Sequence, residues 1–146
     1  MMPSDYKDDA SIRDDERLFR RVHLSQLVKD EDTGLARVSS GVFKDKELSV
    51  NIESALAETG RSAEGCLQNY RAHKLISITA GNSRQFDQVV CRDPLPEDQS
   101  HGLVYGSKNS SNVRNGLRTA SVWVIPPAQP LYEEIEKEMR ALGIRA

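Results

Sequence analysis

The sequence holds few of the residues that build metal centres, with two cysteines and three histidines among 146 residues. No two histidines stand three or four residues apart, and two cysteines are too few for a zinc quartet. Cys66 and Cys91 lie far apart and form neither a C-x-x-C motif nor the framework of a secreted domain. We therefore expect no metal site, no cofactor and two buried structural thiols rather than a nucleophile.

Long apolar runs are also lacking. The most apolar stretch, residues 120–127, is far too short to span a bilayer. No charged segment followed by an apolar one opens the chain, so the sequence carries no sign of a secretion signal. These absences predict a cytoplasmic protein that does not interact with membranes.

Charge is close to balanced, at −2 for the whole chain, but it is unevenly distributed. The first 16 residues hold six acids and two bases, a net charge of −4, which leaves +2 for the remainder. Lysine and arginine never occur in runs longer than two, so a nucleic-acid partner is not expected. Residues 1–15, acidic and without apolar periodicity, predict a disordered tail before a single domain at residues 16–146.

Hydrophobic periodicity predicts an α+β domain with a mixed, mainly antiparallel sheet. Residues 47–52 alternate apolar and polar side chains, the pattern of a half-buried strand. We expect further strands at 18–22, 38–43, 74–79, 88–91, 101–105 and 121–125, and short helices near 54–58, after 62, near 82–86 and at 111–118. Four apolar residues share one face of an amphipathic helix near the C-terminus: Leu131, Ile135, Met139 and Leu142. The elements lack the β-α-β rhythm of a doubly wound sheet.

One constellation suggests an anion-binding cleft, although no phosphate-loop motif is present. An arginine on an early strand offers a guanidinium fork to a phosphate, and serine hydroxyls add directional hydrogen bonds. The candidates are Arg20, Arg21, Ser39, Ser40 and His101. The alternative is an arginine paired with carboxylates and a Ser-Ser-Gly turn.

Two resemblances accompany these residues. Residues 18–22 (LFRRV), 39–45 (SSGVFKD), 48–50 (LSV) and 93–106 (DPLPEDQSHGLVYG) resemble a group of short, uncharacterised bacterial proteins. The order of Arg20 and Ser39-Ser40 is also similar to ADP-ribosyltransferase-like folds, including the RES-domain proteins that consume NAD. That similarity implies that Arg20 binds a dinucleotide. No acid here aligns with the catalytic residue of those enzymes, because Glu53 and Glu58 resemble ordinary helix-surface residues.

Two functional hypotheses follow. The first is a non-catalytic binding or accessory protein of a bacterial multi-component system that contacts another macromolecule, with a protein as partner. Trp123 and Tyr132, which flank a proline-rich junction, are its interface candidates, because aromatic residues are enriched at binding hot spots; the alternative for Trp123 is the core. The second is an NAD- or nucleotide-handling enzyme, a transferase or glycohydrolase. An enzyme should gather the arginine, serine and histidine candidates around one concave site, whereas a binding module need not.

Overall fold

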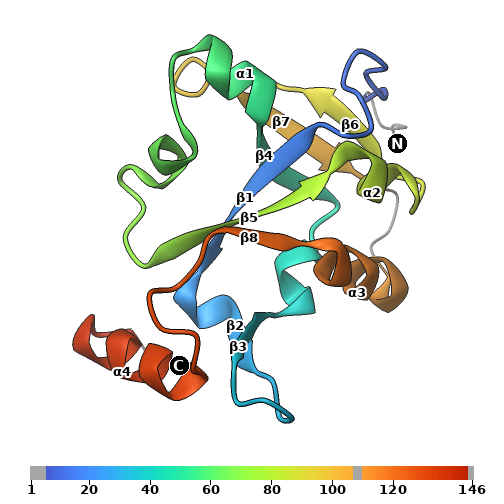
Figure 1. Cartoon of the computed structure of the whole chain (residues 1–146). Coiled ribbons are helices and arrows are strands. Elements are labelled where there is room, and N and C mark those ends of the chain that lie inside the picture. The colour runs from blue at the N-terminus through green and yellow to red at the C-terminus, as the bar shows by residue number, and fades with distance from the viewer. Residues whose placement is uncertain (1–5, 107–109, 145–146) are drawn as a thin grey trace.

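The computed structural model describes residues 6–106 and 110–144, which form an α+β fold around a six-stranded sheet (Figure 1). The strands lie in the order β6-β7-β4-β1-β5-β8, and every neighbouring pair is antiparallel. Their bounds are β1 (Arg17–His23), β4 (Glu47–Ile52), β5 (His73–Thr79), β6 (Val89–Arg92), β7 (His101–Tyr105) and β8 (Val122–Ile125). The predicted α+β class with a mainly antiparallel sheet is confirmed.

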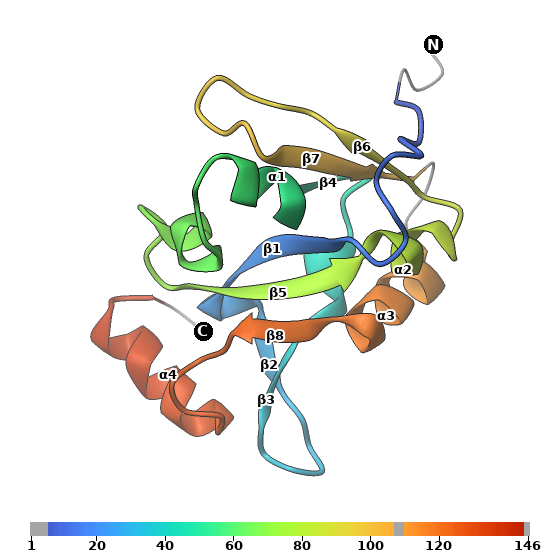
Figure 2. The ribbon, with the colours of Figure 1, turned by 45° about the horizontal axis from the view of Figure 1, so that its top comes forward.

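A separate two-stranded hairpin, β2 (Leu27–Lys29) and β3 (Ala36–Val38), projects from the body beside the C-terminal helix (Figures 1 and 2). The α-helices are α1 (Glu53–Glu58), α2 (Ala80–Arg84), α3 (Ser111–Ala120) and α4 (Tyr132–Ala141), and short 3-10 helices are η1 (Leu24–Gln26), η2 (Ser40–Phe43) and η3 (Ala63–Leu67). Within the described ranges, no helix has the length and apolar character needed to cross a bilayer.

The two faces of the sheet carry separate apolar clusters, because successive side chains of a strand point to opposite faces. Leu18 and Val22 of β1 belong to the larger core, which also contains Phe43 of η2 and Leu117 of α3. On the other face, Phe19 packs in a smaller cluster with Leu56, Cys66 and Leu75. Neighbouring residues of β1 therefore lie on different faces of the sheet, so the side chains of Arg20 and Arg21 have different surroundings.

The N-terminal segment differs from the predicted disordered tail. Ile12 is 1% exposed within the larger core, and the Asp9 N–H donates to the Val90 carbonyl at 2.8 Å. The Asp8 carboxylate accepts hydrogen bonds from the Val90 N–H and from Arg84 Nε, both at 3.0 Å. These partners neutralise the acidic side chains and fasten the segment along the outer edge of β6. Residues 1–5, the rest of the predicted tail, lie outside the described residues.

Two further expectations are corrected. The predicted strand 38–43 ends at Val38, and the chain turns into η2 because the Ser39 hydroxyl accepts the Gly41 N–H at 3.2 Å and caps that helix. Helix α4 buries Ile135 and Met139, but Leu131 and Leu142 remain 46% and 38% exposed. Only the middle of the predicted apolar face therefore docks on the core.

Candidate functional site

A polar cavity of about 630 Å³ opens beside β1, within the size range of small-molecule sites. Three segments meet there: the strand β1, the connection from α1 through η3 toward β5, and the loop between β6 and β7. Its lining includes Arg21, Arg61, Gln68, Tyr70, Glu97 and Asp98. The cavity thus gathers two guanidinium groups, one aromatic ring and two carboxylates.

Arg21 reaches this cavity because it lies on the same face of β1 as Phe19. Its guanidinium carbon lies 3.9 Å from the centroid of the Tyr70 ring, in cation–π geometry. Its Nη1 donates to Asn51 Oδ1 and to the Cys66 carbonyl, both at 3.3 Å. Nε and Nη2 have no hydrogen-bond partner within residues 6–106 and 110–144, so Arg21 keeps donors for an anionic group.

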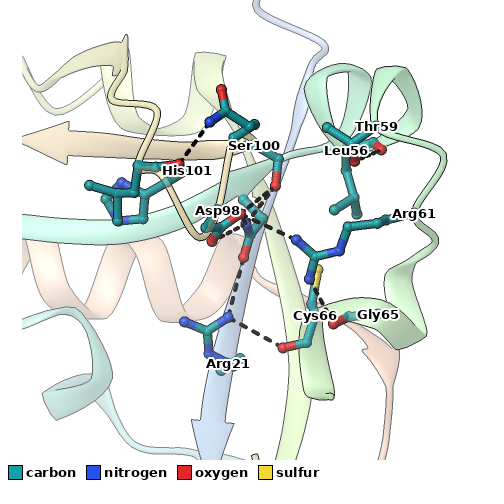
Figure 3. A network of polar contacts seen from close by, with 12 residues as sticks. Arg21, Leu56, Thr59, Arg61, Gly65, Cys66, Asp98, Ser100 and His101 are labelled. Atoms are coloured by element: carbon teal, nitrogen blue, oxygen red, sulfur yellow. Dashed lines mark hydrogen bonds and ion pairs between the residues drawn. The ribbon is translucent and has the colours of Figure 1, made fainter. Parts of the chain in front are cut away.

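Asp98 is the centre of the polar network (Figure 3). Asn51 Nδ2 donates to both of its carboxylate oxygens at 3.0 and 2.9 Å, and Ser100 Oγ donates to Oδ1 at 2.9 Å. Burial by itself raises the pKa of Asp98, but the hydrogen bonds from Asn51 and Ser100 and the charges of Arg61 and His101 outweigh it, so the pKa is lowered. The carboxylate is therefore ionised at neutral pH.

Arg61 fixes the opposite wall. Its Nη2 donates to the Gly65 carbonyl at 2.8 Å, and its Nη1 lies 3.4 Å from Asp98 Oδ1 (Figure 3). The Asn51 side chain, which links Arg21 to Asp98, is held on β4, and its residue is only 4% exposed. The network joins four separate segments of the chain and holds the groups that line the cavity in place.

Arg20 takes no part in this site. Its Nε and Nη2 donate to the Val42 carbonyl at 3.0 and 2.8 Å, and its Nη1 donates to the Ser49 carbonyl at 2.9 Å. All three nitrogens are thus engaged with backbone, and burial lowers the pKa of the guanidinium. Ser39 caps η2 and Ser40 is its first residue, on the side of the sheet that Arg20 faces. These three candidates join η2 to the sheet and do not converge with Arg21.

His101 flanks the cavity from β7. It is the cross-strand partner of Asn51, so the two side chains share one face of the sheet. Its Nδ1 lies 2.9 Å from the Asp93 carbonyl oxygen and 3.1 Å from the Asp93 carboxylate. His101 therefore anchors the start of the loop that carries Asp98. Of the five predicted candidates, Arg21 alone lines the cavity and His101 stands next to it.

The remaining sequence candidates have ordinary surroundings. Trp123 and Tyr132 are partly buried against the larger core, and their role at an interface stays a prediction. Cys66 and Cys91 are unpaired and buried, and burial raises the pKa of both thiols, which disfavours the thiolate. No cluster of three or more potential metal ligands occurs in the part of the chain that the structure describes.

Sequence reasoning missed Asn51, Arg61, Tyr70 and Asp98. Asn51 belongs to the polar side of the alternation in residues 47–52, which predicts exposure, so the sequence carried no signal of its burial. The acid two residues before Ser100 was visible in the sequence but is not a specific signal. No protein-family model, curated protein or solved structure matches the chain. Its own geometry therefore carries the functional conclusion.

Proposed function

We propose that this chain binds a nucleotide-class ligand in the cavity between Arg21 and Arg61. The observation that carries the proposal is the meeting of two guanidinium groups, an exposed tyrosine ring and an ionised carboxylate around one cavity of about 630 Å³. Guanidinium groups suit phosphate oxygens because they present paired N–H donors. The proposal concerns binding and assigns no reaction.

The other lining groups suit the remaining parts of a nucleotide. Tyr70 is an exposed aromatic residue, and one face of its ring is covered by Arg21. The ring also makes a T-shaped contact with His73, with centroids 5.5 Å apart, and its remaining exposed area can stack on a base. Asp98 Oδ1 accepts from Asn51, Ser100 and Arg61, whereas Oδ2 accepts from Asn51 alone. Oδ2 therefore retains acceptor capacity for a ribose hydroxyl.

Thermal unfolding with NAD, ADP-ribose or ATP tests this proposal. A ligand that binds only the folded state adds about 2.7 kcal/mol at a hundredfold excess over its Kd. For a chain of this length that corresponds to a rise in Tm of roughly 5–11 °C. We expect Arg21→Gln and Arg61→Gln to lose the shift while keeping the far-UV circular dichroism spectrum.

Arg140→Gln, on the exposed surface of α4, is the matched control and should keep the shift. The wild-type protein is titrated with each nucleotide to millimolar concentration to look for the result that would contradict the proposal. If none of the three raises Tm in folded protein, nucleotide binding at this cavity is wrong.

A second candidate function is the docking of a basic macromolecular partner. Leu35 and Leu131 are both exposed and face each other through an isolated β-bridge between the hairpin and the start of α4. Exposed acids lie close to them in the sequence, in the hairpin turn at Glu31 and Asp32 and on α4 at Glu133. An apolar centre with a charged rim is a common form of protein interface, and this one fits a partner with basic residues around an apolar anchor.

Fluorescence anisotropy with a labelled amphipathic helical peptide of lysine and leucine tests this surface. We expect saturable binding that is lost in the double variant Leu35→Ser, Leu131→Ser. Val122→Ser, which removes an exposed apolar residue on β8, is the control and should bind as wild type. Equal binding by the double variant, or no binding by wild type, would exclude this surface as the docking site.

A further inference from the structure

A second, smaller cavity lies on the other face of the sheet from Arg21. Its volume is about 130 Å³, and it is bounded by β3, β5, β8 and the end of α3. The residues that matter for its chemistry are Arg37, Val38, Ile76, Arg118, Ser121 and Trp123. No acidic residue lines it, although two arginines do.

Arg118 has an unsatisfied donor at this place. Its Nε is buried and has no hydrogen-bond partner among the described residues. Buried polar groups in folded proteins nearly always have a partner, and the cost of leaving one unpaired is larger for a charged group. Neither Arg118 nor Arg37 forms an ion pair within the ranges that the structure describes. An anion in this cavity would supply the missing partner of the buried guanidinium donor and of the second arginine.

The backbone of β3 adds a donor on the same side. Two hydrogen bonds show which N–H groups of this strand point toward β2 and which point away from it. The Ser39 N–H donates to the Gln26 carbonyl, on the side of β2, whereas the Ala36 N–H donates to the Pro130 carbonyl, on the other side. In an antiparallel pair, alternate residues direct their N–H groups away from the partner strand. Val38 therefore points its N–H away from β2, as Ala36 does, and Val38 is one of the residues that line the cavity.

The end of α3 does not oppose an anion strongly. Its last carbonyls carry partial negative charge, which would repel an anion if they were free. Ser121 donates to two of them, its N–H to the Leu117 carbonyl at 2.9 Å and its hydroxyl to the Arg118 carbonyl at 2.7 Å. The two full arginine charges exceed the partial charge of about −0.5 at the helix end, so the net charge of these groups at the cavity is positive.

We propose that this cavity binds one small tetrahedral oxyanion, a free phosphate or the phosphate group of a monoester. The volume corresponds to about four water molecules at roughly 30 Å³ each, which suits the five heavy atoms of a phosphate. Arg118 Nε, Arg37 and the Val38 N–H hold the oxygens, while Ile76 and Trp123 form the wall. The site lies on the opposite sheet face from the nucleotide cavity and does not depend on it.

Tryptophan fluorescence gives a direct measurement, because Trp123 is the single tryptophan of the chain and lines the cavity. Inorganic phosphate and O-phosphoserine are titrated at constant ionic strength, with sodium chloride as the blank. We expect a saturable change with at least one phosphate compound and none with chloride. Tighter binding of phosphoserine identifies a phosphorylated side chain as the source, and tighter binding of inorganic phosphate identifies the free ion.

Variants separate this site from the other one. Arg118→Gln and Arg37→Gln should each weaken phosphate binding at least tenfold, whereas Arg21→Gln and Arg140→Gln should leave it unchanged. Because Arg37 is exposed, its variant carries the test even if Arg118→Gln does not fold. The proposal is overturned if the wild-type signal does not saturate, if chloride reproduces it, or if Arg37→Gln binds phosphate as wild type.

Discussion

Ile12 provides the sharpest test of how the N-terminal segment is held. It lies fully within the larger core, although its neighbours in sequence are mostly acidic or polar. Replacing a buried isoleucine by alanine generally costs about 2–5 kcal/mol, and the cost falls when the site can collapse around the gap. The segment that carries Ile12 can shift inward, so we expect Ile12→Ala to cost about 2–3 kcal/mol. For a chain of this length that lowers Tm by about 4–12 °C.

Urea unfolding followed by circular dichroism measures this cost, with Arg13→Ala as the control. The Arg13 side chain is 82% exposed, so its removal should change the free energy of unfolding by less than about 0.5 kcal/mol. Both variants lie in the same segment and differ in burial. An Ile12→Ala variant as stable as Arg13→Ala would show that the segment does not pack on the core in solution.

Four further variants test other parts of the fold by urea unfolding. Ile135→Ala should cost about 2–4 kcal/mol and Leu142→Ala less than about 1 kcal/mol, because only the first side chain is buried; equal costs would contradict the docking of α4. Arg20→Met should cost about 2–3 kcal/mol, since it leaves two carbonyls without their donor, and a neutral result would contradict that role. Burial, and then the charge of His73, lowers the pKa of His23 below its ordinary 6.5, so the folded state favours the neutral ring. This contribution of His23 to the stability of the fold is complete above pH 6.5 and is lost on acidification. His23→Asn keeps an acceptor for the cap of η1 and should weaken the loss of stability between pH 7 and 5; an unchanged pH dependence would contradict this.

Much of the fold follows from local sequence patterns. The alternation in residues 47–52 predicts β4 with its correct bounds. The Ser110 cap locates the start of α3, and the spacing of apolar residues locates α4. The N-terminal segment was harder, because its acidic composition masks one buried side chain. Asp8 and Asp9 find their partners at Arg84 and Val90, and no local pattern predicts contacts over such separations.

The candidate site could be predicted only in part, because it depends on strand pairing and on loops. Arginine was the right residue type, but sequence alone does not say which of Arg20 and Arg21 faces which side of the sheet. The pairing of β1 with β4 decides it, since it places Arg21 within reach of Asn51. Arg61 and Asp98 join through connections that have no periodicity from which their positions could be derived.

The anchoring of the N-terminal segment on β6 also orders events during synthesis. Asp9 must wait for Val90, its hydrogen-bond partner about 80 residues later, to leave the ribosome. At roughly 5–20 residues per second, that delay is on the order of 4–16 s. Until then the edge of β6 that the segment covers does not exist, although other partners of the segment, such as Ser54 for Glu16 and Arg84 for Asp14, are already translated. The attachment of this segment to β6 therefore cannot form before translation has passed residue 90.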